Sequence, residues 1–190
     1  SIFFGLFVIF AAIEYMFPKR IVAKSKTRRW ITNWLVSVFN VLTLRIFAFA
    51  LPLLAIGAAF DAQNLDSGLF NRLGLPFWFE FIMVILILDF FIWLQHLLTH
   101  KIEFLWRIHR VHHSDTEMDV STAIRFHPIE IALSMALKIS LVYALGADPL
   151  SVLIFEILLN GSSIFNHANI NIPYRIDKIV RFVIVTPDMH

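Results

Sequence analysis

"LPFWFEFIMVILILDFFIWLQHLLTH", residues 75–100, is an almost unbroken apolar run that ends in two histidines. A helix of roughly 20 apolar residues crosses a hydrocarbon core about 30 Å thick. The run therefore predicts a membrane-spanning helix over about 75–99. The whole chain agrees, because 58% of its 190 residues are hydrophobic and 16% are charged, and its mean hydropathy is +0.74. Because a soluble domain of this size could not bury so much apolar surface, we predict an integral membrane protein.

The composition also restricts the chemistry. The sequence contains no cysteine, so disulfides, thiolate metal sites and cysteine nucleophiles are excluded, and nitrogen or oxygen must hold any metal. The net charge of +2 comes from basic residues in short segments between apolar runs. Such segments are typical of membrane topology signals. We therefore expect no nucleic-acid partner.

Hydropathy predicts five helical segments, at about 1–17, 31–60, 75–99, 129–145 and 149–168. The second is too long for one straight crossing and contains Arg45 and Pro52, which favours a kink or an interfacial portion. The fourth and fifth, joined by the turn "GADP", form either two spans or a hairpin that enters the membrane partway. The expected fold is an all-α integral membrane bundle of four to five transmembrane or re-entrant helices. We expect a single domain over 1–190 that is part of a longer protein.

Basic residues predict the orientation of this bundle. Six lie in residues 19–29, four in 101–125 and three in 173–190, whereas the loop 61–74 contains only Arg72. The side of a membrane protein that is rich in lysine and arginine is usually cytoplasmic. The loop after residue 100, the end of the fifth segment and the C-terminal tail should therefore be cytoplasmic.

All the histidines lie in the second half of the chain, at the predicted cytoplasmic boundary: His96, His100, His109, His112, His113, His127, His167 and His190. His96 and His100 are four residues apart, which stacks their side chains on one helical face. A helix through residues 109–113 would likewise present three imidazoles on one face. Neutral imidazole binds iron, copper and zinc, and eight histidines are more than one ion requires. We therefore predict two metal ions, each with an open coordination position; a polar cluster at the lipid headgroups is the alternative.

The histidine boxes resemble those of the fatty acid hydroxylase and sterol desaturase superfamily of membrane non-haem di-iron enzymes. The similarity covers about residues 75–190 and rests on "HLLTH", "HRVHH", "RFHP", "NHAN" and "TPDMH". The family has a third box, H-x-x-H-H, of which His190 would be the first residue. Nothing follows His190 in this sequence, so two ligands that the family pattern contains are absent here.

The resemblance implies a function, cofactors and partners. Two non-haem irons would activate dioxygen with two external electrons, and a C–H bond of a fatty acyl chain, sterol or ether lipid would be hydroxylated or desaturated. Hydroxylation is favoured because it requires less exact placement of a second C–H bond. The electrons would come from a separate protein, either cytochrome b5-like or a ferredoxin with its reductase. No catalytic residues are expected beyond the metal ligands.

Several of these residues have two interpretations. His127 precedes a proline at a helix start and either bonds locally or ligates, as the resemblance implies. His167 ends an apolar segment and is either a core residue or, by the resemblance, a ligand. Asp89 lies on the same helical face as His96 and either orients an imidazole or pairs with Arg45 or Lys138. Further supporting positions are Asp115 and Asp119, in a loop that is otherwise solvated, and Asn166 and Asn169 beside His167.

A function from another class is a membrane electron carrier with bis-histidine haem, or a metal transporter. Haem ligation favours single histidines on facing helices near the middle of the membrane, and a transporter favours ligands along a crossing path. Histidines gathered at one boundary fit neither arrangement well. A haem absorption band would separate the carrier from the oxygenase.

Overall fold

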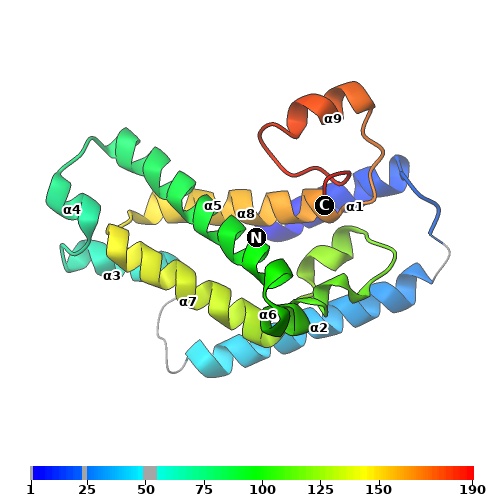
Figure 1. The fold of residues 1–190 in the computed structure, drawn as a ribbon, viewed down its shortest axis with the longest axis horizontal. Coiled ribbons are helices and arrows are strands. Elements are labelled where there is room, and N and C mark those ends of the chain that lie inside the picture. Colours follow the sequence, from blue (N-terminus) through cyan, green and yellow to red (C-terminus); the bar gives the residue numbers. More distant parts are fainter. Residues whose placement is uncertain (1, 23–24, 49–54) are drawn as a thin grey trace. The chain divides into compact units, whose positions relative to one another are not determined.

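The computed structural model describes residues 2–22, 25–48 and 55–190, and this part of the chain is helical, with no strand (Figure 1). Two short 3₁₀ helices, η1 and η2, stand among longer α-helices. The elements are α1 (Ile2–Met16), α2 (Lys26–Ala48), α3 (Ala55–Asn64), α4 (Leu69–Leu73), α5 (Phe77–Lys101), α6 (Glu103–His109), η1 (His112–Ser114), η2 (Val120–Ile124), α7 (Pro128–Leu145), α8 (Pro149–His167) and α9 (Tyr174–Val180). The predicted all-α class is confirmed.

Three of the described helices, α5, α7 and α8, are long and apolar enough to cross a membrane. They match the third, fourth and fifth predicted segments. The first predicted segment forms α1, an apolar helix of 15 residues. The second is not one described helix, because α2 ends at Ala48 and α3 begins at Ala55. The predicted kink at Pro52 lies outside the described residues.

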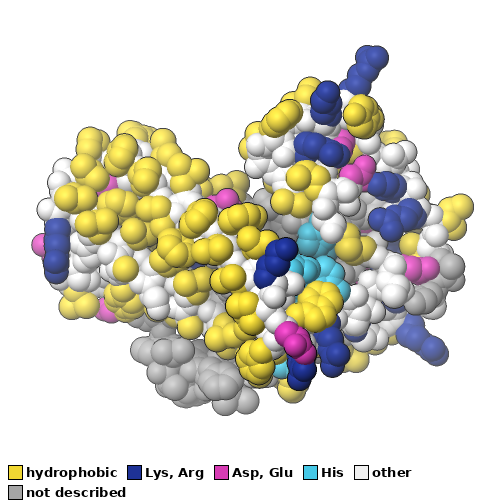
Figure 2. Space-filling model, in the orientation of Figure 1, with side chains coloured by type: hydrophobic (Ala, Val, Ile, Leu, Met, Phe, Trp, Pro, Cys, Tyr) yellow, Lys and Arg dark blue, Asp and Glu magenta, His cyan; other side chains and the backbone are white. Residues whose placement is uncertain are grey.

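One face of α5 carries large apolar side chains that are exposed in the isolated chain. They recur every three or four residues, which places them along a single stripe of the helix. Figure 2 shows many hydrophobic side chains on the visible surface over α5 and α7. A bilayer would cover such a stripe. Its members are Trp78, Ile82, Leu86, Phe90 and Trp93.

Packing divides the chain into two units, and residues 40–109 and 127–156 form one of them. In this unit α7 packs against α3, α4, α5 and α6, and α6 also packs on α5. Val84 and Leu88 of α5 and Val142 of α7 are almost completely buried in it. Buried apolar side chains on both helices, together with the packing of α7 on α5, place α5 and α7 in one body.

The predicted turn between the fourth and fifth segments forms at Gly146. This residue has a left-handed backbone (φ 67°), and its N–H donates to the carbonyls of Val142 and Tyr143. A Cβ on Gly146 would strike the carbonyl oxygen of Ser67 and the side chain of Asn71. Glycine is therefore required both for the conformation and for the close approach.

Residues 1–39, 110–126 and 157–190 form the other unit. Its core is aromatic, since the Phe7 ring of α1 lies 5.6 Å from Trp30 and 5.2 Å from Trp34 of α2, both edge-on. The buried Glu14 carboxylate of α1 accepts hydrogen bonds from the backbone N–H groups of Val120 and Asn169 and from Lys26. One carboxylate thus connects α1, α2, η2 and the segment after α8.

Candidate metal centre

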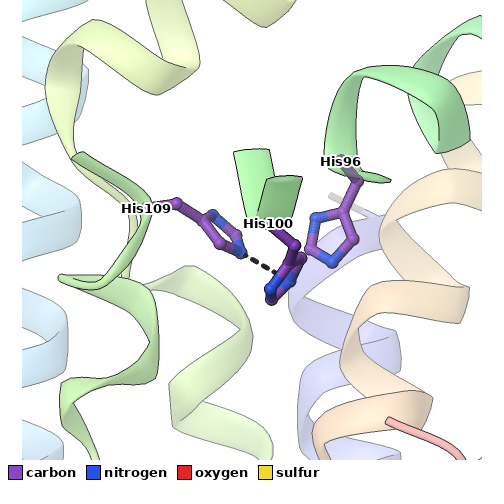
Figure 3. Close-up of side chains that lie close together, drawn as sticks. All are labelled: His96, His100 and His109. Carbon is purple, nitrogen blue, oxygen red and sulfur yellow. Dashed lines mark hydrogen bonds between the residues drawn. The ribbon is translucent and has the colours of Figure 1, made fainter. Parts of the chain in front are cut away.

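His96, His100 and His109 form a group in which one nitrogen from each lies within 4.8 Å of the others. Figure 3 shows the three imidazoles turned toward one another. The Nε2 atoms of His100 and His109 lie 3.2 Å apart. The ring centroids are 4.7 to 4.9 Å apart. His109 is buried, His96 is half-buried and His100 is exposed. One ion at the centre would be reachable from the surface.

A break in the helix creates this group. His96 and His100 stand one turn apart on α5, as their spacing predicts. The backbone at Ile102 is extended, so α5 ends and α6 begins at Glu103. Because α6 packs back on α5, its last residue, His109, meets the earlier pair.

A carboxylate holds the far side of the His109 ring. Nδ1 of His109 lies 2.6 Å from Oε1 of Glu130, in the first turn of α7. His109 is 0% exposed and Glu130 is 8% exposed. A neutral His109 that donates its Nδ1 proton to Glu130 leaves Nε2 as the ligating atom.

His112, His167 and His190 form a second group, again with one nitrogen from each within 4.8 Å of the others. His112 and His167 are buried and His190 is half-buried. The His112 ring stacks on Phe126 at a centroid distance of 4.4 Å, with the ring planes 4° apart. The stack fixes the plane of an imidazole that lies in a 3₁₀ turn.

The hydrogen bonds of the second group suit a metal. Nδ1 of His112 lies 3.0 Å from the carbonyl oxygen of Arg125, and Nδ1 of His167 lies 2.6 Å from that of Ser163. Because a carbonyl only accepts, each Nδ1 carries the proton. The two Nε2 atoms, 2.7 Å apart, then direct lone pairs at each other. A shared cation relieves that repulsion, so the donor set fits a metal that prefers imidazole.

Arg125 shapes the loop that carries His112. Its guanidinium donates to the carbonyl of Val111, to Asn33 and to the hydroxyl of Ser114. Its own carbonyl holds Nδ1 of His112. One residue therefore fixes both the path of the loop and the orientation of a ring.

A buried ion pair connects the same loop to α2. Arg29 donates to both oxygens of Asp115 at 2.9 Å, and Asn33 donates to one of them. Burial raises the pKa of Asp115, but the hydrogen bonds and charge of Arg29, with the bond from Asn33, outweigh it, so the pKa lies below its ordinary value. Asp115 is thus a buried, paired residue in the loop that was expected to be otherwise solvated.

The predicted helical face of three histidines at 109, 112 and 113 is wrong. α6 ends at His109, and the 3₁₀ helix η1 begins at His112. His109 consequently joins the first group and His112 the second. His113 belongs to neither group, although the centroid of its ring lies 6.1 Å from that of His190.

His127 caps α7, because its Nδ1 accepts the N–H of Ile129.

The other predicted supporting residues differ in their surroundings. Asp89 is exposed on α5. The Lys138 partner considered for it bonds Glu156 instead, at 2.6 Å, and the Arg45 side chain lies outside the described part.

Asp119 caps η2 and accepts hydrogen bonds from the backbone N–H of Ser121 and from the Trp30 indole. Asn169 bonds the backbone of Arg20 through its side chain. The side-chain oxygen of Asn166 is buried without a hydrogen-bond partner among the described residues.

Sequence reasoning missed three residues that organise these groups: Glu14, Arg125 and Glu130. Glu130 stands three residues after His127, and an acid near a histidine box was the available signal. Glu14 and Arg125 had no local signal, because their partners are distant in sequence.

Fold and site together define a helical membrane protein with two groups of three convergent histidines. A family described as fatty acid hydroxylase matches residues 81–190. The chain belongs to the fatty acid hydroxylase family, which confirms the resemblance inferred from the histidine boxes.

Two relatives are similar to this chain. Cholesterol 25-hydroxylase of Homo sapiens is 29% identical over 104 residues, which cover 54% of this chain and 37% of the relative. Ornithine lipid hydroxylase OlsE of Rhizobium tropici is 35% identical over 80 residues, which cover 42% of this chain and 24% of the relative. The chain thus matches little more than a third of the length of the first relative and about a quarter of the length of the second. No solved structure matches the chain significantly.

Proposed function

We propose that this chain belongs to an O₂-dependent membrane oxygenase that hydroxylates a C–H bond of a lipid. The observation that carries the proposal is the pair of three-histidine groups in a member of the fatty acid hydroxylase family. The names of the two relatives, a cholesterol hydroxylase and an ornithine lipid hydroxylase, support a lipid substrate.

The proposed cofactor is two non-haem irons, one in each group. Imidazole nitrogens suit iron, and three per ion leave coordination positions open. When bound, the irons would supply dioxygen activation. The overall reaction takes one C–H bond, O₂, two electrons and two protons, and it yields an alcohol and one water. The electrons would come from a separate donor, either cytochrome b5-like or a ferredoxin with its reductase.

The residues of this chain would bind and orient the irons. Glu130 and the carbonyls of Arg125 and Ser163 hold the Nδ1 protons of three histidines, so that their Nε2 atoms face inward. The long apolar helices would keep the lipid chain in the bilayer near the predicted cytoplasmic boundary. A porphyrin between two opposed imidazoles suits neither group, since a third ring lies within the same 4.8 Å cluster. The geometry therefore favours single ions over haem.

Iron content and isotope incorporation test the proposal. The chain, loaded with Fe²⁺ without oxygen, should bind two irons, and His96→Ala and His167→Ala should each lose one. With an electron donor, ¹⁸O₂ and a panel of sterols, fatty acyl lipids, ether lipids and ornithine lipids, mass spectrometry should detect an alcohol that contains one ¹⁸O. A product two hydrogens lighter without ¹⁸O would establish desaturation instead. Absence of bound iron would overturn the proposal.

A further inference from the structure

Glu130 differs from the other buried acids near the two groups. Oε1 contacts His109, and Oε2 has no hydrogen-bond partner in the described part of the chain. Within those residues no lysine or arginine forms an ion pair with it, whereas Arg29 pairs with Asp115 and Lys26 with Glu14. A buried carboxylate without a cationic partner is costly.

The two histidine groups also differ in what stands behind their rings. In the first group a carboxylate accepts the Nδ1 proton of His109. In the second group the acceptors are neutral carbonyls, those of Arg125 and Ser163. A carboxylate makes the imidazole more basic and so a stronger metal ligand than a neutral acceptor does.

We propose that Glu130 makes the two metal positions unequal. Its negative charge strengthens Nε2 of His109 as a donor, and the ion bound by His96, His100 and His109 supplies the positive charge that Glu130 lacks. In the second group, the acceptors described for His112 and His167 are neutral carbonyls, which supply no such charge. This inference rests on the proposed function, because it requires that both groups bind metal.

A merely structural acid at the start of a helix would behave differently. The first turn of α7 stabilises an anion, but that effect alone requires no histidine partner. Glu130 is instead buried and directed at a ring whose other nitrogen faces the group. A test of the proposal should therefore change the charge of the Glu130 side chain and keep its shape.

Glu130→Gln removes the charge and keeps the shape, since the amide oxygen still accepts from Nδ1 of His109. The matched control is Glu103→Gln on α6, which removes a charge from an exposed pair with Arg107. The metal-free chains are titrated with Co²⁺, whose visible absorption reports its ligands. We expect two bound ions in each protein. In Glu130→Gln one of them should bind about 10–100-fold more weakly with a shifted spectrum, while the control should match the unaltered chain.

Histidine variants assign the affected ion. In a His190→Ala background only the first group is intact, and Glu130→Gln should still weaken the binding of Co²⁺. In a His96→Ala background this weakening should vanish. The metal-free Glu130→Gln protein should also melt no lower than the unaltered chain, because an unpaired buried charge has been removed, yet it should gain less from Co²⁺. A structural role predicts the opposite, a lower melting temperature without metal.

The outcomes separate this inference from the proposed function. If the unaltered chain binds two ions but Glu130→Gln leaves both affinities unchanged, or weakens both equally, the inequality is wrong and the metal centre stands. A lower melting temperature of the metal-free variant would also overturn the inference. If the unaltered chain binds no Co²⁺, the proposed function itself fails.

Discussion

Nε2 of His112 lies 2.7 Å from Nε2 of His167, although the two residues are 55 positions apart in the sequence. One comes from a 3₁₀ turn after α6 and the other from the last turn of α8. Carbonyl acceptors fix both Nδ1 protons. This arrangement is the one that the proposed shared cation requires.

This sharing has a testable consequence for iron content. His112→Ala and His167→Ala should each remove one iron of two, and the double variant should remove no more than either single variant, because both residues serve the same ion. His127→Ala is the matched control, since its ring caps a helix. Loss of both irons in the double variant would show that the two histidines hold different ions.

His127 should contribute to stability and not to metal binding. Its ring accepts the N–H of Ile129 at the start of α7. Replacing a helix cap by alanine costs about 1 kcal/mol, whereas asparagine is a good cap. We expect His127→Ala to lower the free energy of unfolding by about that amount and His127→Asn to restore it, with two irons in both. Loss of iron in His127→Asn would identify the residue as a ligand.

The Arg29–Asp115 pair should be a strong stabiliser of the loop that carries His112. Both side chains are buried, 9% and 4% exposed, so Arg29→Met would leave Asp115, and also Asp119 at 3.0 Å from the same guanidinium, as uncompensated charges. Breaking such a pair costs about 3–5 kcal/mol, which thermal melting in detergent would detect. An exposed control, Arg107→Met, should change stability by less than about 1 kcal/mol.

The same pair predicts a pH dependence. The pKa of Asp115 is lower in the folded chain than its ordinary value because of Arg29 and Asn33. Its contribution to stability is therefore complete above the ordinary aspartate pKa and is lost as the pH falls through the lowered value. Melting curves of the unaltered chain and Asp115→Asn should differ at neutral pH and converge in strong acid. A constant difference throughout would contradict the assignment.

Lys138 and Glu156 form an ion pair on two apolar helices, α7 and α8. Lys138→Met alone should destabilise the chain by about 3–5 kcal/mol, since it leaves a charged partner in an apolar setting. The double variant with Glu156→Leu should recover most of this loss. If the double variant were as unstable as Lys138→Met, the pair would not be the source of the effect.

The sequence was informative where the signal is local. Hydropathy located α5, α7 and α8, and the four-residue spacing of His96 and His100 placed both on one face. The histidines at 109, 112 and 113 were misassigned to one helix, because nothing local in "HRVHH" marks the end of α6 at His109. The partners that decide their positions, Glu130 and His167, depend on tertiary packing. Contacts between residues so far apart in the sequence leave no periodic pattern from which they could be predicted.

The first group and its carboxylate differ from the second group in the order in which the ribosome makes them. His96, His100, His109 and Glu130 all exist once residue 130 has been added, whereas the second group waits for His190. At a synthesis rate of roughly 5–20 residues per second, that interval lasts about 3–12 seconds. During it, a growing chain would contain every residue of the proposed metal position beside Glu130 but not yet every residue of the second position.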